Sequence, residues 1–306
     1  MDIAALIEKM AVLFFSILTG YLAARAGVLS TEGNRQLSRL LVNVANPLLI
    51  VSSVLRGEHL LANTEVLALT GLIVCCYACT IALGLLVPRL LRAPQEQRGT
   101  YQFMFIFSNI GFMGYPVVAS LFGASAIFYV SLFVLFFQLL CWSYGVSLIS
   151  GAPKFRFERK VLKQPCLIAA LFAYVFYLSG LRAPELAYKA TSYVGELTSP
   201  LAMLVIGSSL AQMDLRKIFG NWRIYVLCAL KMVVVPLLMY AVLRLVIQNQ
   251  LMLGVTMVTL CMPVATNTTL ISYAYGRDPD LASSGVFIST VLRFFTIPLT
   301  MYLLFG

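Results

Sequence analysis

Charged residues are scarce in this 306-residue chain, at 11% of the total, against about 25% in an ordinary soluble domain. No long basic run or aromatic-interleaved basic patch is present, which argues against nucleic-acid binding despite a formal charge of +10. Hydrophobic residues make up 60% of the chain, and the mean hydropathy is +0.90. A water-soluble core cannot absorb that much apolar surface, so the sequence predicts an integral membrane protein.

Residues that carry catalytic or metal chemistry are also few. The seven cysteines all lie in apolar segments, where we interpret them as packing residues rather than metal ligands. The single histidine, His59, falls in an expected loop, and no carboxylate pair lies at membrane depth. We therefore expect no catalytic residues, no metal and no cofactor, and a membrane enzyme is disfavoured. No Walker-type phosphate loop occurs, which argues against direct use of ATP.

Apolar runs of spanning length follow one another along the whole chain. They predict an all-α integral membrane fold with ten transmembrane helices, numbered 1 to 10 in chain order. The expected ranges are 5–25, 36–55, 64–87, 100–122, 125–149, 163–181, 191–211, 223–246, 251–275 and 282–304.

Lys and Arg residues are about three times as frequent in the loops after odd-numbered helices as in the other loops. Because such residues are retained on the cytoplasmic side, both termini are expected on the non-cytoplasmic side. We expect a multi-pass protein of the plasma membrane, or of the inner membrane if the source is bacterial. The N-terminal segment lacks the positive region of a cleaved signal peptide and is expected to remain as helix 1.

Prolines recur at similar offsets in the two halves of the chain. The matching positions are Pro47, Pro88 and Pro116 in helices 2, 3 and 4, and Pro200, Pro236 and Pro263 in helices 7, 8 and 9. Five helices per half is an odd number, so the second half must enter the membrane with the opposite orientation. The sequence therefore predicts two inverted five-helix repeats, 1–150 and 151–306.

Helices 4 and 9 contain residues that interrupt a helix near the middle of the membrane. These residues are Asn109, Gly111, Gly114 and Pro116 in helix 4, and Pro263, Thr266, Asn267 and Thr268 in helix 9. Proline removes a backbone donor and glycine tolerates irregular dihedrals, so both helices are predicted to break there. Two breaks at matching depth favour a polar site between the two halves. The structural alternative is that each break is a proline kink whose free backbone groups bond to neighbouring helices.

Three stretches resemble the auxin efflux carrier family, which includes plant auxin exporters and bacterial carriers described as malonate or malate permeases. They are 40–49, with Asn43, Asn46 and Pro47; 109–123, with its Asn-x-Gly-x-x-Gly-x-Pro run; and 263–298, with its Pro-Val-Ala-Thr-Asn run. The resemblance implies that helices 4 and 9 cross near the midplane. It also implies a scaffold of helices 1, 2, 6 and 7, a transport bundle of helices 3–5 and 8–10 that moves like an elevator, and a homodimer.

Two half-helices that resume at the midplane would point the positive ends of their dipoles at one cavity and attract an anion. Asn109 and Asn267 can add amide donors without fixed charge, which suits a carboxylate that must bind and then leave. Thr266, Thr268 and Ser108 are further candidates, unless they only bond to helix carbonyls.

Two cations fall inside expected helices, where burial is costly. Arg293, in helix 10, is a candidate clamp for an anionic substrate, and the alternative is a cation bonded to helix carbonyls. Members of the family have a small or apolar residue at this position. The difference supports a role for Arg293 in substrate specificity. Lys231, in helix 8, is a supporting candidate that could extend to the cytoplasmic end of its helix.

The sequence therefore predicts a secondary transporter that moves a small organic anion, bound between helices 4 and 9. An anion channel or a membrane receptor of the same fold is the alternative. The expected partners are the substrate anion, membrane lipid and a second copy of the chain. Only Glu196 among the acidic residues could lie in the membrane, so uniport, exchange and symport with protons or sodium stay open.

Overall fold

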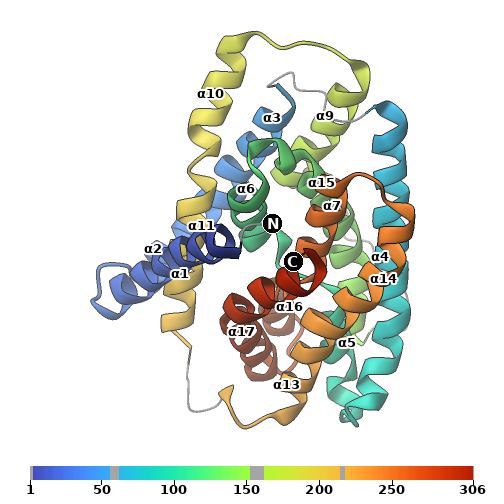
Figure 1. The fold of residues 1–306 in the computed structure, drawn as a ribbon. Coiled ribbons are helices and arrows are strands. Elements are labelled where there is room, and N and C mark those ends of the chain that lie inside the picture. The colour runs from blue at the N-terminus through green and yellow to red at the C-terminus, as the bar shows by residue number, and fades with distance from the viewer. Residues whose placement is uncertain (1–2, 56–61, 152–161, 214–217, 306) are drawn as a thin grey trace.

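The computed structural model describes residues 3–55, 62–151, 162–213 and 218–305. Within these ranges the chain forms helices and one isolated β-bridge, and no strand (Figure 1). The all-helical architecture is therefore confirmed. His59 and the loop cations within 152–161 and 214–217 lie outside the described residues.

Helices lie in every range expected from the apolar runs of the first half. The first half contains α1 (Ile3–Arg25), α2 (Thr31–Leu40), the π-helix η1 (Leu41–Ala45), α3 (Asn46–Leu55), α4 (Asn63–Leu90), α5 (Arg98–Ile106), the π-helix η3 (Ile110–Gly114), α6 (Tyr115–Phe122), α7 (Ile127–Leu140), the π-helix η5 (Cys141–Gly145) and α8 (Val146–Ser150). Short 3₁₀ turns, η2 (Gln95–Gln97) and η4 (Ala124–Ala126), precede α5 and α7.

The second half follows the expected ranges equally closely. It contains α9 (Pro165–Ser179), α10 (Glu185–Gly195), α11 (Thr198–Ala211), α13 (Trp222–Ala229), the π-helix η7 (Leu230–Val234), α14 (Val235–Val246), α15 (Gln250–Leu260), α16 (Asn267–Ala274) and α17 (Pro279–Phe305). Polar side chains cap several of these helices: Asn221 accepts from the Arg223 amide and Asn249 from the Met252 amide.

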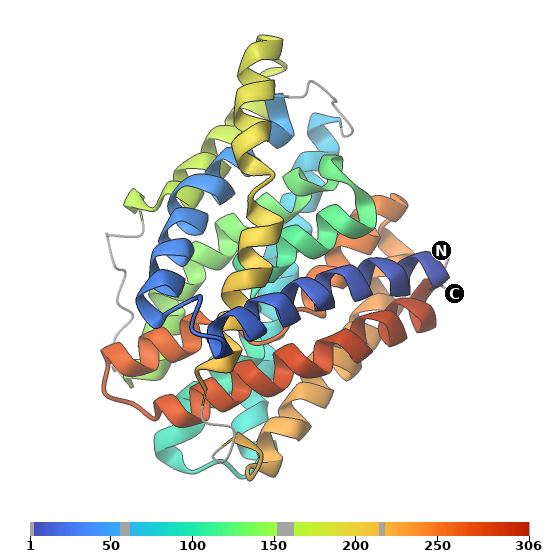
Figure 2. The same ribbon diagram turned by 90° about the vertical axis from the view of Figure 1, so that its left-hand side faces the viewer.

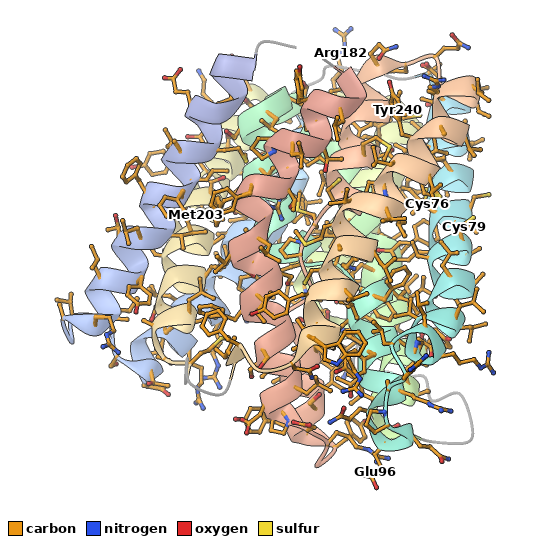
Figure 3. All side chains as sticks on the ribbon, turned by 60° about the horizontal axis from the view of Figure 1, so that its bottom comes forward. Cys76, Cys79, Glu96, Arg182, Met203 and Tyr240 are labelled. Carbon is orange, nitrogen blue, oxygen red and sulfur yellow. The ribbon has the colours of Figure 1, made fainter. Side chains whose placement is uncertain are left out.

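Among the described residues, six helices are long and apolar enough to cross a membrane by length and composition. They are Thr31–Leu55, Asn63–Leu90, Ala124–Ser150, Glu185–Ala211, Trp222–Val246 and Pro279–Leu303. Glu96 and Arg182 lie at opposite ends of the molecule, and Cys76 and Cys79 lie on α4 between those ends (Figure 3). The protein is therefore a multi-pass membrane protein.

Three π-helical segments each end two residues before a proline. Residues 41–45, 110–114 and 230–234 precede Pro47, Pro116 and Pro236, respectively. A proline ring clashes with the carbonyl of the preceding turn, and a wider turn relieves that clash without ending the helix. These prolines therefore widen their helices rather than terminating them.

Helices from distant parts of the chain pack in two groups. In one group α1 packs against α11, and α3 packs against α9 and α10. Gly20 and Gly207 allow the first of these contacts, since a Cβ atom on either would overlap the backbone of the facing helix. In the other group α4 packs against α5, and α13 and α16 pack against α17. The groups meet where α1 and α17 run side by side in opposite directions (Figure 2).

Candidate functional site

Two helices of the second packing group are interrupted in mid-course. The chain leaves helical geometry between Ile106 and Ile110, and again between Leu260 and Asn267. We call residues 107–109 and 261–266 the paired interruptions. Both segments contain residues that the sequence placed at a break, but the first interruption begins before Gly111 rather than at the Gly and Pro residues.

The paired interruptions hydrogen-bond to each other through their backbones. The amide of Asn109 donates to the carbonyl of Pro263 at 2.8 Å, and the amide of Ala265 donates to the carbonyl of Phe107 at 3.1 Å. Ser108 and Val264 form the isolated antiparallel bridge between them. Each non-helical stretch thus satisfies backbone groups of the other, which is what non-helical backbone at membrane depth requires.

A side chain from α17 satisfies a further backbone group of the second interruption. The amide of Val264 donates to Ser289 Oγ at 3.0 Å, and both residues are fully buried. Without this hydroxyl a buried N–H group would lack a partner, which is costly. Ser289 therefore fixes the second interruption against α17.

Two cavities meet at the paired interruptions. Cavity A has a volume of about 400 Å³ and lies between the second interruption, α11 and α17. Cavity B has a volume of about 290 Å³ and lies between the first interruption, η1, α7 and the start of α9. Four residues line both cavities: Asn109, Phe112, Asn267 and Leu270.

The four shared residues follow one pattern in both halves of the chain. An asparagine stands where each helix resumes, and an apolar side chain follows three residues later. Residues three apart lie on one face of a helix, so both pairs point to the same two cavities. Phe112 and Leu270 were not among the residues expected at the site, although their spacing after each asparagine could have indicated them.

The two asparagines offer amide donors at the cavity walls. Asn109 is 3% exposed, and its Nδ2 atom has no hydrogen-bond partner among the described residues. Asn267 Nδ2 reaches only the thiol of Cys141, at 3.7 Å. Because buried amide donors are normally paired, the Asn109 amide indicates a ligand or solvent in the cavities, whereas Asn267 is only partly buried.

No Asp, Glu, His, Lys or Arg side chain lines either cavity among the described residues. The polar lining consists of amides and hydroxyls, including Thr266 and Thr269 in cavity A and Asn43 and Asn46 in cavity B. The α16 helix and the η3–α6 helix also begin here, with the positive ends of their dipoles at the cavities. This set of groups can bind an anion but supplies no general base.

Some expected site residues have structural contacts instead. Thr268 Oγ1 donates to the carbonyl of Ala265 at 2.6 Å, and Thr268 lines neither cavity. This agrees with the alternative that its hydroxyl only bonds to a backbone carbonyl. Gly114 and Pro116 lie inside the resumed helix, and Pro47 lies inside α3. Gly111 lines cavity B and has no positive φ, so it does not supply the irregular dihedral that we expected.

The structure places Arg293 outside both cavities. Its side chain is 1% exposed, its Nη1 atom lies 3.8 Å from Met113 Sδ, and its Nη2 atom has no partner among the described residues. It also lies close enough to Cys261 to interact with it electrostatically. Thr290, one turn earlier on α17, is the residue that lines cavity A.

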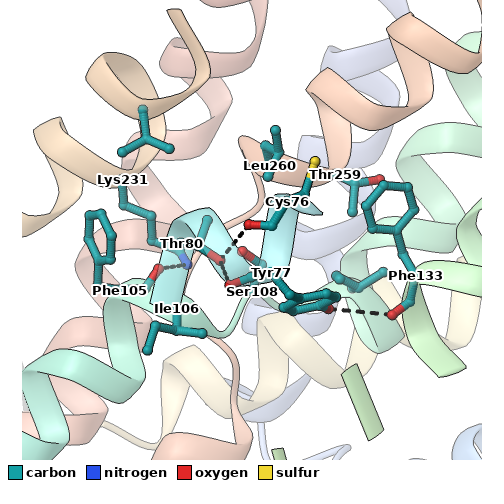
Figure 4. Close-up of a pocket in the computed structure, with 12 residues that line it drawn as sticks. Cys76, Tyr77, Thr80, Phe105, Ile106, Ser108, Phe133, Lys231, Thr259 and Leu260 are labelled. Carbon is teal, nitrogen blue, oxygen red and sulfur yellow. Dashed lines mark hydrogen bonds between the residues drawn. The ribbon is translucent and has the colours of Figure 1, made fainter. Parts of the chain in front are cut away.

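Lys231 does not extend to the end of its helix, so that expectation is wrong. It is 4% exposed, and its Nζ atom donates to the carbonyl of Phe105 at 2.7 Å (Figure 4). Phe105 is in the last turn of α5, where carbonyls lack helical partners and the dipole is negative. A small cavity of about 30 Å³ adjoins this contact and is also lined by Ser108.

Comparison with known proteins identifies the family. The family model described as "Membrane transport protein" matches residues 5–156 and 152–301. An "Uncharacterized transporter" of Methanothermobacter thermautotrophicus is 29% identical over 289 residues, covering 92% of this chain and 93% of the relative. An uncharacterized transporter of Methanocaldococcus jannaschii is 25% identical over 300 residues, with 94% and 95% covered.

A relative from Rhizobium meliloti carries a more specific name, "Putative malonate transporter". It is 24% identical over 303 residues, which cover 95% of this chain and 93% of the relative. The matches extend over almost the whole chain, including both interruptions. The chain therefore belongs to the membrane transport protein family, the family of auxin efflux carriers that its sequence resembles, and it is a membrane transporter.

Proposed function

We propose that this protein is a secondary transporter that carries a small organic anion, and that the anion binds at the paired interruptions. The observation that carries the proposal is the position of Asn109 and Asn267. Each lies where a broken helix resumes, and both line the same two cavities. Amide donors and two positive helix ends converge there, with no carboxylate in the lining to repel an anion.

A carboxylate is the anion that fits this chemistry best. It accepts hydrogen bonds from amides and hydroxyls, and the neutral lining allows it to leave again. The name of the Rhizobium relative, which refers to malonate, agrees with a small carboxylate. Arg293, which lies outside both cavities, is then a candidate to attract the substrate through its charge alone, and Lys231, Asn43, Asn46 and Pro47 support the site.

The transport mechanism that we propose is an elevator. Ten spanning segments form two inverted repeats, 1–150 and 151–306. The helices of the first packing group, α1, α2–α3, α9 and α10–α11, form the scaffold, and the remaining helices form a moving bundle that includes the paired interruptions. The protein works as a homodimer in the plasma membrane, with both termini on the non-cytoplasmic side.

Uptake by reconstituted liposomes tests the function. Purified protein is tested with radiolabelled malonate, malate, succinate and indole-3-acetate, and we expect saturable uptake of at least one acid. Asn109→Ala should lower the affinity about tenfold, since a hydrogen bond to a charged group contributes about 1.5–3 kcal/mol. Asn63→Ala removes an exposed amide far from the cavities in sequence and is the control.

Two results would contradict the proposal. One is the absence of flux for every acid from folded protein in sealed liposomes. The other is an equal loss of uptake in Asn109→Ala and Asn63→Ala, which would disconnect the site from transport. Electrical recordings with single-channel currents would instead support an anion channel.

A further inference from the structure

Two cations are buried in this protein without a buried carboxylate to balance them. Lys231 is 4% exposed and Arg293 is 1% exposed. Among the described residues no Asp, Glu or His is buried, and the ion pairs Arg35–Glu32 and Lys189–Glu185 both lie on the surface. Within the described part of the chain, neither buried cation therefore has a buried carboxylate as its counterion.

Both cations lie close to the paired interruptions. Lys231 bonds to Phe105, two residues before the first interruption, and Arg293 lies 3.8 Å from Met113, four residues after it. Helix dipoles compensate this charge only in part, because the end of a helix carries about half a charge. Among the described residues, the partner of the Arg293 guanidinium is the thioether sulfur of Met113, which is a weak acceptor.

Both cations also belong to elements outside the scaffold group. Lys231 lies on η7 and Arg293 on α17, and η7 contacts α17 directly. If these elements move with the paired interruptions, the two charges cross the membrane interior together with the binding site. Moving an uncompensated charge through a region of low dielectric constant raises the barrier for that movement.

An anion bound at Asn109 and Asn267 changes this balance. It places negative charge at the paired interruptions, near the elements that carry the two cations, and reduces the net charge of the moving part. The loaded protein then meets a lower barrier than the empty protein, because attraction between opposite charges is strong where water is excluded.

We propose that this protein is an exchanger, in which Lys231 and Arg293 prevent the empty binding site from crossing the membrane. Efficient turnover then requires an anion on the outward journey and another on the return. This inference rests on the proposed function, since it assumes that an anion is carried at the paired interruptions.

The test compares two modes of uptake in the same liposomes, with the membrane potential clamped at zero by valinomycin and equal potassium. Radiolabelled malonate, malate, succinate or indole-3-acetate is offered outside. The liposomes contain either buffer alone or the same unlabelled acid. We expect the initial rate of uptake with internal acid to be at least about tenfold higher than with buffer alone. The reason is that the loaded site would return at least about tenfold faster than the empty site.

Variants show whether the two charges cause this difference. Lys231→Met and Arg293→Met each remove one buried charge and keep an apolar side chain of similar length. We expect the ratio of exchange to net uptake to fall at least about threefold in either variant. Lys189→Gln, which removes an exposed cation on α10, should keep the wild-type ratio.

The possible outcomes separate the two proposals. Labelled acid that enters equally fast with and without internal acid overturns the exchange mechanism but keeps the transporter. No entry of any acid in either mode overturns the proposed function and the exchange mechanism with it. A wild-type ratio retained in both charge-removing variants overturns the role of Lys231 and Arg293.

Discussion

Asn46 Nδ2 donates a hydrogen bond of 3.0 Å to the carbonyl of Gly111. Asn46 is the first residue of α3, in the first packing group, and Gly111 lies in the π-helix that follows the first interruption. The bond therefore joins the two packing groups directly beside cavity B, which both residues line. Any motion of the interruptions past α3 must break it.

Replacing Asn46 by Ala should loosen the first interruption. A typical intramolecular hydrogen bond contributes about 0.5–1.5 kcal/mol, so we expect local opening of 107–116 to become about fivefold more frequent. Hydrogen–deuterium exchange mass spectrometry of a peptide covering these residues measures the change. Asn43→Ala removes an amide from the same cavity wall but keeps the bond to Gly111. Equal exchange in the two variants would contradict a special role for Asn46.

Replacing Asn109 or Asn267 by Asp should abolish anion binding while changing the shape of the site very little. A carboxylate there repels the substrate where water is largely excluded, and we expect the affinity to fall at least about a hundredfold. Competition with unlabelled malonate measures the change. Asn249→Asp introduces the same charge at a helix cap, where Asp is well tolerated, and should retain wild-type affinity.

Replacing Ser289 by Ala should destabilise the second interruption. The Val264 amide would lose its acceptor in a fully buried position, at a cost of about 1–3 kcal/mol. Thermal unfolding in detergent should show a lower midpoint. Ser284→Ala is the control on the same helix, because Ser284 Oγ bonds to the carbonyl of Asp280 within α17. A midpoint no lower than that of the control would show that Val264 finds another partner.

Replacing Gly207 by Ala should separate α1 from α11. The new Cβ atom would overlap the carbonyl oxygen of Ile17, and overpacking of this kind costs about 1–3 kcal/mol. We expect a lower unfolding midpoint in detergent. Gly71→Ala, on α4, is the control, because a Cβ atom there meets nothing within 4 Å and alanine favours a helix. A stabilised Gly207→Ala variant would mean that the two helices are free to move apart.

The lengths of the apolar runs were sufficient to predict the positions of most helices. The expected helix at 64–87 is Asn63–Leu90, and the expected helix at 282–304 is Pro279–Phe305. Such ranges are readable because a span requires about 20 consecutive apolar residues, whatever their neighbours. A π-helical turn precedes each of Pro47, Pro116 and Pro236. Its position also depends on nearby sequence alone, because a proline ring acts on the turn that precedes it.

The exact geometry of the site was harder to predict from the sequence, because contacts between residues far apart in the chain determine it. The first interruption begins at residue 107 rather than at Gly111, since the Asn109 amide bonds to Pro263 instead of to its own helix. The direction of the Lys231 side chain likewise depends on a carbonyl of α5. The positions of Asn109 and Asn267 at the interruptions were predictable from the neighbouring helix-breaking residues, whereas the absence of Arg293 from both cavity linings was not.

The backbone bridge between Ser108 and Val264 has a consequence for the order of assembly. Its two sides are synthesised far apart in time, because about half of the chain lies between them. Until the later segment has entered the membrane, the amide of Asn109 and the carbonyl of Phe107 lack the partners that they have in the finished protein. The paired interruptions are therefore among the last features to form during biogenesis, after most of the helices that surround them are in place.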